Sequence, residues 1–269
     1  MKTICLLIIV LLTDCSKREN SSNSEPVEAD DKLIFSDEFD VDGALDTGKW
    51  KLETIPPNNG SWWNGEKQHY TDRPDNVYIS NGTLKIVAKK ESYTFQGSTK
   101  SYTSARLNSK FSFTYGRVDV RAKLPSGEGT WPAIWTLGSN ITDVGWPKCG
   151  EIDIMEHWGH DPTIVSSATH NPACFGGCPD VTVGKTIIDD FDTEFHVYSI
   201  IWNENEIRFL IDDIHKYTYS PTVKNADNWP YTADQFILLN VAMGGSWFSI
   251  DPNFQKAQME IDYVRVYKN

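Results

Sequence analysis

Helical periodicity is almost absent from this 269-residue chain, and internal repeats and long apolar runs are missing as well. Its one N-terminal apolar run, Ile4–Leu12, is too short to cross a membrane as a stable helix. Basic residues are outnumbered, because 25 Lys and Arg face 37 Asp and Glu, which gives a formal charge of −12. Such an acidic chain is a poor general binder of nucleic acid or anionic membranes. Sulfated and uronate polymers are mildly disfavoured as substrates for the same reason.

Aromatic residues, in contrast, are abundant, with 10 Trp, 11 Tyr and 12 Phe. That is more than a minimal hydrophobic core requires. Most of the tryptophans are expected in the core, but a surplus in an acidic β-protein is typical of carbohydrate binding, where aromatic planes stack on the C–H faces of sugar rings. The chain length without its N-terminus fits one all-β domain.

The N-terminal segment has the features of an export signal. Residues 1–15 combine a basic start with a short apolar run and end at Cys15 in a sequence that resembles a bacterial lipoprotein cleavage site, although Asp14 departs from the usual small residue. Residues 16–31 are polar and predict a disordered tether. We therefore expect an exported protein that is lipid-anchored on Cys15 to a bacterial cell envelope or surface, or else secreted, with its folded domain at 32–269. We expect a monomer.

Three cysteines lie outside the signal region. Cys174 and Cys178 are a close pair in an exported chain, which predicts a small loop disulfide. Zinc is the rival explanation, but the sequence lacks a second Cys/His pair with suitable spacing. Cys149 is then left as a buried free thiol, unless it pairs with one of the other two.

The stretch from Glu151 to Glu156 (EIDIME) holds three carboxylates among apolar residues. Its alternation predicts a β-strand, on which Glu151 and Asp153 share a face. Glu156 is out of phase by one residue. If Met155 is the extra residue of a β-bulge, Glu156 rejoins the acidic face, and bulges are common beside active sites. The isoleucines would then pack behind the acids.

Two carboxyls on one strand face suit a retaining glycosidase, which needs a nucleophile and a general acid/base. Asp153, between Glu151 and Glu156, could raise the pKa of a neighbouring carboxyl and orient the nucleophile by a hydrogen bond. A solvated acidic strand face and a divalent-metal site are the competing interpretations of the same residues.

Short β-patterned segments separated by turn signals fill the rest of the chain. Asn81-Gly82 is a strong hairpin signal. A dozen or so short strands predict a jelly-roll sandwich of two antiparallel sheets, with a concave face that forms the cleft. The expected strands are 32–39, two within 76–90, 102–107, 110–113, 116–124, 130–137, 151–156, 163–170, 195–202, 206–211, 236–243 and 259–267.

Over residues 33–267 the chain resembles glycoside hydrolase family 16, and within it the bacterial laminarinases, which are endo-β-1,3-glucanases. The signature is EIDIME at 151–156, supported by WWNGEKQHY at 62–70, GRVDVRAKLPSGEGTWPAIWTLG at 116–138 and IDYVRVY at 261–267. The resemblance implies an all-β, concanavalin A-like jelly roll and retaining hydrolysis of a laminarin-like β-1,3-glucan, with mixed-linkage β-1,3-1,4-glucan as a further substrate.

The same resemblance implies roles for particular residues. Glu151 would be the nucleophile, Glu156 the general acid/base and Asp153 an assisting acid, with no cofactor for catalysis. Seven further residues would contact substrate, namely Trp131 and Trp135 beside the cleaved bond, Asn64, Arg106 and His170 at sugar hydroxyls, and Trp146 and Trp247 as outer stacking platforms. One of Trp131 and Trp135 could instead be core, and His170 could be structural.

A structural calcium is also implied, on the side away from the cleft. Its ligands would be the main-chain oxygens of Glu38 and Gly82, together with Asp262; oxygen ligands suit this ion. The competing interpretation of Asp262 is an ordinary solvent-facing strand acid.

Several alternatives to the laminarinase interpretation stay open. Met155 argues against the lichenases, which typically lack the extra residue, but agarases and carrageenases carry it. A transglycosylase would share every residue named above. A jelly-roll lectin or binding protein has no need of both Glu151 and Glu156. The CFGGC loop at 174–178 and Cys149 are not family requirements and lie near the cleft, where they could alter the subsites and the linkage preference.

Overall fold

The computed structural model describes residues 32–176, 178 and 183–268. The predicted signal segment and tether lie outside these residues. Two β-sheets make up almost all of the described structure. The helical segments are the single turns η1, Trp63–Gly65, and α1, Ile141–Val144. No helix in this part of the chain is long and apolar enough to span a membrane.

The smaller sheet has seven strands in the order β12-β11-β10-β9-β16-β7-β2. Every neighbouring pair in it is antiparallel. The strands are β2 (Trp50–Leu52), β7 (Arg106–Phe113), β9 (Thr130–Gly138), β10 (Glu151–His157), β11 (Ile164–His170), β12 (Val183–Ile187) and β16 (Gln235–Met243).

The larger sheet has ten strands, of which eight follow the order β15-β14-β13-β8-β17-β5-β6-β3, while β1 pairs with β17 and β4 with β5. Only β3 and β6 run parallel. The strands are β1 (Lys32–Asp37), β3 (Gln68–Tyr70), β4 (Val77–Ser80), β5 (Thr83–Phe95), β6 (Ser98–Ser104), β8 (Gly116–Lys123), β13 (His196–Trp202), β14 (Ile207–Ile211), β15 (Ile214–Tyr219) and β17 (Lys256–Lys268).

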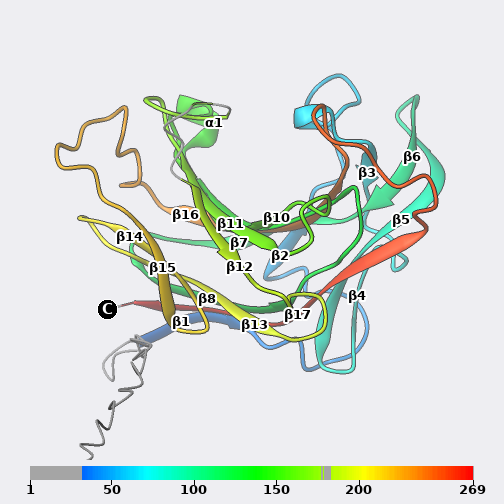
Figure 1. The fold of residues 1–269 in the computed structure, drawn as a ribbon, viewed down its shortest axis with the longest axis horizontal. Helices are drawn as coiled ribbons and strands as arrows, with labels where there is room; N and C mark the ends of the chain where they lie inside the picture. Colours follow the sequence, from blue (N-terminus) through cyan, green and yellow to red (C-terminus); the bar gives the residue numbers. More distant parts are fainter. Residues whose placement is uncertain (1–31, 177, 179–182, 269) are drawn as a thin grey trace, which may run out of the picture.

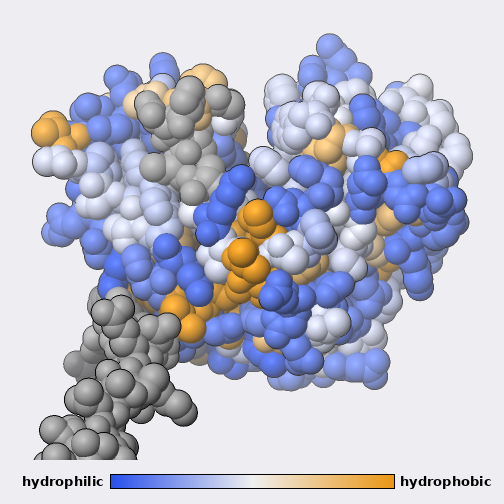
Figure 2. Space-filling view, in the orientation of Figure 1, coloured by the Kyte–Doolittle hydropathy of each residue, from blue (hydrophilic) through white to orange (hydrophobic). Residues whose placement is uncertain are grey.

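One hydrophobic core lies between the two sheets. Alternate residues of β8, including Val118 and Val120, pack in it against Ile152 and Ile154 of β10. The seven-stranded sheet curves, and loops rise on both sides of its free face (Figure 1). In the space-filling view the molecule is hollowed between these two walls (Figure 2). The predicted two-sheet jelly roll with a concave face is therefore confirmed.

Most predicted strands are present, and the exceptions have local causes. The expected strand at 102–107 is wrong, because the chain leaves β6 at Ser104 and enters β7, in the other sheet, at Arg106. Four strands were missed, namely β2, β3, β12 and β15. The predicted turn at Asn81-Gly82 is correct, with positive φ at both residues, as a tight hairpin requires.

Candidate active site

Strand β10 carries the three acids and contains the predicted bulge. Asp153 pairs with Trp135 of β9, and Glu156 pairs with Ala133, so three steps on β10 match two on β9. Met155 itself pairs with Ile134, which leaves Ile154 as the residue without a β9 partner. The bulge is confirmed, but on this ladder the extra residue is Ile154, not Met155.

Behind the bulge the apolar side chains enter the core. Ile152, Ile154 and Met155 are all buried there. The hydroxyl of Ser167, on the neighbouring strand β11, donates a hydrogen bond to the main-chain oxygen of Ile154 (2.8 Å). Two consecutive apolar residues can thus face inward because the bulge gives both of them room, and the acids keep the opposite face.

A glycine sets the start of β10. Gly150 has φ +75°, and a Cβ there would lie 2.9 Å from the ring of Tyr231. Any other residue would collide with this buried tyrosine and strain the backbone. Tyr231 therefore packs directly against the main chain that presents Glu151.

The acids lie in a cleft of about 660 Å³. Eight of the ten predicted catalytic and substrate-binding residues line it, and the other two are His170 and Trp247. The predicted residues that line it are Asn64, Arg106, Trp131, Trp135, Trp146, Glu151, Asp153 and Glu156. Trp131 and Trp135 both face the cleft, so neither is purely a core residue.

Each glutamate accepts a hydrogen bond from a tryptophan of the cleft wall. The Trp146 indole N–H donates to Glu151 Oε2 (2.7 Å), and the Trp131 indole N–H donates to Glu156 Oε1 (2.8 Å). These bonds fix the direction of both carboxyls. They also leave the second oxygen of each glutamate available, one for attack and one to hold a proton.

His170 completes the cluster from the end of β11. Its Nε2 lies 3.1 Å from Asp153 Oδ2 and 4.0 Å from Glu151 Oε1. The main-chain N–H of Gly176 donates to Nδ1 of the same ring (3.2 Å). Nδ1 accepts this bond, and the Nε2 contact with Asp153 Oδ2 is at ion-pair distance without hydrogen-bond geometry. His170 is therefore in contact with the acids and is not one of the residues that line the cleft.

Burial raises the pKa of all three carboxyls. For Glu151 the charge of Asp153 adds to the effect of burial, and for Asp153 the charge of Glu156 does so. Burial is the main cause for Glu156 as well, although the Trp131 hydrogen bond lowers its pKa. Like charges this close cannot all ionise, so the cluster holds protons near neutral pH.

The remaining predicted platform, Trp247, lies beside the cleft. Its ring is 52 % exposed and meets the Trp131 ring at a centroid distance of 5.4 Å. Trp131 also meets Trp158, edge to face. Trp158 therefore packs behind the cleft wall, and Trp247 extends the wall outward from Glu156.

Sequence reasoning missed part of the cleft floor. Glu53 forms an ion pair with Arg106 (2.9 Å), and Arg106 lies over the Trp135 ring. Asn240 accepts the Trp135 indole hydrogen bond (2.7 Å). Glu53 and Asn240 both line the cleft. Neither residue belongs to a recognisable sequence motif. Glu53 lies in a loop, and Asn240 lies in an otherwise apolar strand.

Glu66 and Tyr70 also line the cleft. Glu66 is buried, which raises its pKa, and it accepts hydrogen bonds from Gln68 (2.6 Å) and Tyr70 (3.1 Å). Both residues lie in the aromatic and amide segment at 62–70. That segment supports the family resemblance, but apart from Asn64 nothing in the sequence separated its cleft residues from its buried ones.

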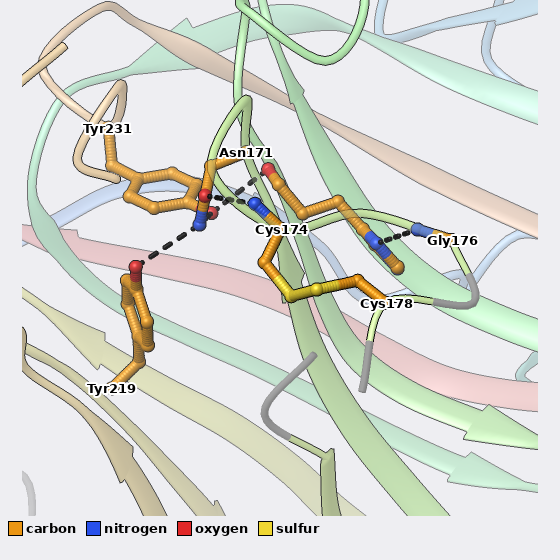
Figure 3. The surroundings of a disulfide bond; sticks show 7 residues. Asn171, Cys174, Gly176, Cys178, Tyr219 and Tyr231 are labelled. Carbon is orange, nitrogen blue, oxygen red and sulfur yellow. Dashed lines mark hydrogen bonds between the residues drawn. A yellow bond between two sulfur atoms is a disulfide. The ribbon is translucent and has the colours of Figure 1, made fainter. Parts of the chain in front are cut away.

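The cysteine predictions are confirmed. Cys174 and Cys178 form a disulfide beside the end of β11 (Figure 3). Cys149 is a buried free thiol. Burial and the charge of Glu151 raise the pKa of Cys149 to about 11, so this thiol stays protonated and unreactive at neutral pH.

The three predicted calcium ligands lie far from the acids in the fold. The pairing of β1 and β5 with β17 brings Glu38 and Gly82 toward the stretch of β17 that holds Asp262. The Glu38 carboxylate accepts hydrogen bonds from Arg265, which leaves its main-chain oxygen as the predicted ligand. The Asp262 carboxylate is paired with Arg121 (2.6 Å). The calcium site stays a prediction.

The acids and His170 also satisfy a simple test for metal binding. One ligand atom each of Glu151, Asp153 and His170 lie within 4.8 Å of one another. Two carboxylates and an imidazole could hold a divalent ion. The tryptophan hydrogen bonds to Glu151 and Glu156 are not explained by that interpretation, since they orient carboxyls along the cleft.

Comparisons with known proteins give a consistent result. The sequence model of the glycosyl hydrolases family 16 matches residues 64–265. A beta-glucanase of Rhodothermus marinus is 40 % identical over 250 residues, covering 88 % of this chain and 85 % of that protein. A glucan endo-1,3-beta-glucosidase of Niallia circulans is 37 % identical over 95 % of this chain, which spans 41 % of that longer protein.

A solved structure supports the same grouping. The LamA protein of Zobellia galactanivorans, crystallised with laminaritriose and laminaritetraose, is 49 % identical and superposes with a TM-score of 0.79. The match covers 88 % of this chain and 99 % of that one.

Proposed function

The chain belongs to the glycosyl hydrolases family 16, and we propose that it is an endo-acting hydrolase that cleaves β-1,3-glucan with retention of configuration. The observation on which this rests is the bulged strand β10, which presents Glu151, Asp153 and Glu156 on one face of a cleft. The relatives that are described as acting on β-1,3-glucan or binding laminarin oligosaccharides support the substrate class.

In the first step Glu156 protonates the glycosidic oxygen while Glu151 attacks the anomeric carbon. The raised pKa of Glu156 keeps it protonated for this task, and the Trp131 hydrogen bond holds one of its oxygens so that the other carries the proton. The leaving sugar departs with that proton. A covalent ester between Glu151 and the sugar remains.

Glu151 must be ionised to attack, although burial raises its pKa. Asp153 resolves this conflict. Its own pKa is raised by burial and by the charge of Glu156, and it is hydrogen-bonded to Glu151. A proton held on Asp153 lets it donate to Glu151, and the Trp146 N–H also stabilises the Glu151 carboxylate.

In the second step the roles of Glu156 reverse. Now ionised, it removes a proton from a water molecule, which attacks the anomeric carbon and releases Glu151. Two inversions give net retention. Glycoside hydrolases of this family need no catalytic cofactor, and the proton that Glu156 gives to the leaving sugar is regained from the attacking water.

Product analysis of the purified protein tests the proposal. Laminarin, mixed-linkage glucan and agarose are each incubated with wild type and with Glu151→Ser. We expect oligosaccharide ladders from laminarin, a β-anomeric first product by NMR and no cleavage by the variant. Release from agarose alone would overturn the substrate and keep the mechanism. Binding without cleavage of any polymer would favour a carbohydrate-binding protein.

Export and lipid anchoring on Cys15 are proposed from the N-terminal sequence, which lies outside the described residues. Metabolic labelling with a palmitate analogue in a bacterial host would label wild type but not Cys15→Ala. The calcium site is proposed from the family resemblance and from the oxygen donors of Glu38, Gly82 and Asp262. Calcium should raise the melting temperature of the chelator-treated protein and not that of Asp262→Asn.

A further inference from the structure

The loop after β11 is fastened to the fold at several points. Asn171 and Cys174 exchange main-chain hydrogen bonds (3.0 Å each), and the Asn171 side chain binds the hydroxyls of Tyr219 (3.1 Å) and Tyr231 (3.3 Å) (Figure 3). The disulfide then ties Cys178 back to Cys174. The segment between the two cysteines is therefore a short covalent loop on a fixed base.

From this base the loop reaches both groups that orient the nucleophile. Its Gly176 N–H donates to Nδ1 of His170, whose Nε2 contacts Asp153. Its Phe175 ring meets the Trp146 ring edge to face, at a centroid distance of 5.1 Å. Trp146 in turn donates to Glu151.

Trp146 needs such a support. Its side chain is 46 % exposed, and it follows the single helical turn α1, so little of the core holds it in place. Phe175 is itself 44 % exposed. Besides its hydrogen bond to Glu151 and a ring contact with His170 (6.3 Å between centroids), Trp146 meets Phe175, and the disulfide limits the movement of Phe175 and so supports Trp146.

We infer that the Cys174–Cys178 loop is a positioning element of the active site, which sets the direction of the Glu151 carboxylate through Phe175–Trp146 and through Gly176–His170. This inference rests on the proposed function. It assigns Phe175 as a positioning residue, since its ring acts through Trp146. Opening the disulfide should slow the attack of Glu151 more than it weakens substrate binding.

An activated substrate isolates that attack. With 2,4-dinitrophenyl β-laminaribioside the leaving group needs no proton, so formation of the covalent intermediate depends on Glu151 and not on Glu156. Rapid mixing at saturating glycoside gives the rate constant of the dinitrophenol burst, which reports this step, whereas steady-state kcat also contains the Glu156-dependent release of the intermediate. We expect the burst rate constant to fall about tenfold in the double variant C174S/C178S, the size of loss that a sub-ångström displacement of a reacting group produces. The glycoside concentration at half-maximal burst rate should change less than twofold.

A mechanism-based 2-fluoro laminaribioside counts active sites, so that the burst amplitude is compared with the number of competent sites and partial unfolding is detected. Reductant should lower the burst rate constant of wild type to the level of the double variant and leave the double variant unchanged; both proteins keep the Cys149 thiol. Phe175→Ala should reproduce part of the loss, and Phe175→Trp should restore it.

Two results would overturn the inference, and they differ from failure of the proposed function. One is a burst rate constant within twofold of wild type in the double variant. The other is a change confined to the glycoside concentration at half-maximal burst rate, which would make the loop a sugar contact only. If wild type itself neither releases dinitrophenol nor takes up the label, the proposed function fails, and the inference fails with it.

Discussion

The acidic residues of the two sheets have opposite kinds of neighbours. On the ten-stranded sheet, alternate residues of β8 point away from the core, and acids on that face meet cations. Glu260 accepts from Lys85 and Lys123, and Asp262 from Arg121. On the seven-stranded sheet the acids meet each other instead, with His170 as the nearest basic side chain among their contacts.

The pKa values of the acids shift in opposite directions on the two sheets, and this distinguishes acids that stabilise the fold from acids that serve catalysis. Burial opposes ionisation of Glu260, but hydrogen bonds from Lys85 and Lys123 lower its pKa below the ordinary value of 4.5. Burial raises the pKa of Glu151 and Asp153. The outer face stabilises the fold when its acids are charged, whereas the cleft destabilises it in that state and gains proton chemistry in return.

The largest effect is expected from removal of the nucleophile. Glu151→Ser should lower kcat on laminarin by about four orders of magnitude, because no other group can form the covalent intermediate. The initial rate of reducing-sugar release measures this. Its melting temperature at pH 8 should not fall, since the change removes a buried charge from a repulsive cluster. A variant that keeps more than a tenth of the activity would mean that another residue attacks.

The general acid is the next test. Glu156→Gln should lower kcat on laminarin by about two to four orders of magnitude. On 2,4-dinitrophenyl β-laminaribioside the formation of the covalent intermediate should survive, because that leaving group needs no proton. Rapid-mixing kinetics would show a burst of dinitrophenol followed by slow turnover. Added azide should restore turnover by replacing the water that Glu156 activates. A burst rate as depressed as the laminarin rate would assign Glu156 another role.

Asp153 affects both the stability of the fold and the proton chemistry of the cleft. Asp153→Asn should raise the melting temperature at pH 8 by a few degrees, at roughly 2–4 °C per kcal/mol, because it removes a buried charge. The sign follows from the raised pKa, since a group of this kind supplies stability below its unfolded pKa of about 4 and loses it as pH rises through the folded value. The gain should therefore vanish near pH 4. Calorimetry from pH 4 to 8 measures it.

On the outer face we expect a change in stability without a change in activity. Glu260→Gln should lower the free energy of unfolding at pH 7 by about 2–3 kcal/mol, because it leaves the buried Lys85 ammonium without its partner. With a lowered pKa the sign reverses, so this loss should disappear as pH falls below about 4. The more exposed Glu38→Gln, paired with Arg265, is the matched control and should cost under about 1 kcal/mol. Denaturant titrations measure both, and activity should not change.

Local patterns were sufficient for most of the fold and for the acids. Alternation identified β8, β9 and β10, and the phase error between Asp153 and Glu156 predicted a bulge, because both signals lie within a few adjacent residues. The position of the extra residue was wrong because it depends on how β9 pairs with β10. Pairing is a property of two segments, and one of them is 20 residues away along the chain.

Residues that act through distant neighbours could not be predicted. Glu53 matters for its ion pair with Arg106, and Asn240 for its bond to Trp135, contacts that bring together strands remote in sequence. The short strands β2 and β3 were missed for a similar reason. With three residues each, they show too little alternation to be recognised, and their pairing partners hold them in place.

The bulge in β10 has a consequence for changes in chain length. In a regular strand, gain or loss of one residue turns every later side chain to the opposite face. Here two residues occupy the space of one, so removal of Met155 would leave Glu-Ile-Asp-Ile-Glu with all three acids still directed into the cleft. We therefore expect a variant without Met155 to keep its three acids on the cleft face, which its melting temperature and its activity on laminarin would check.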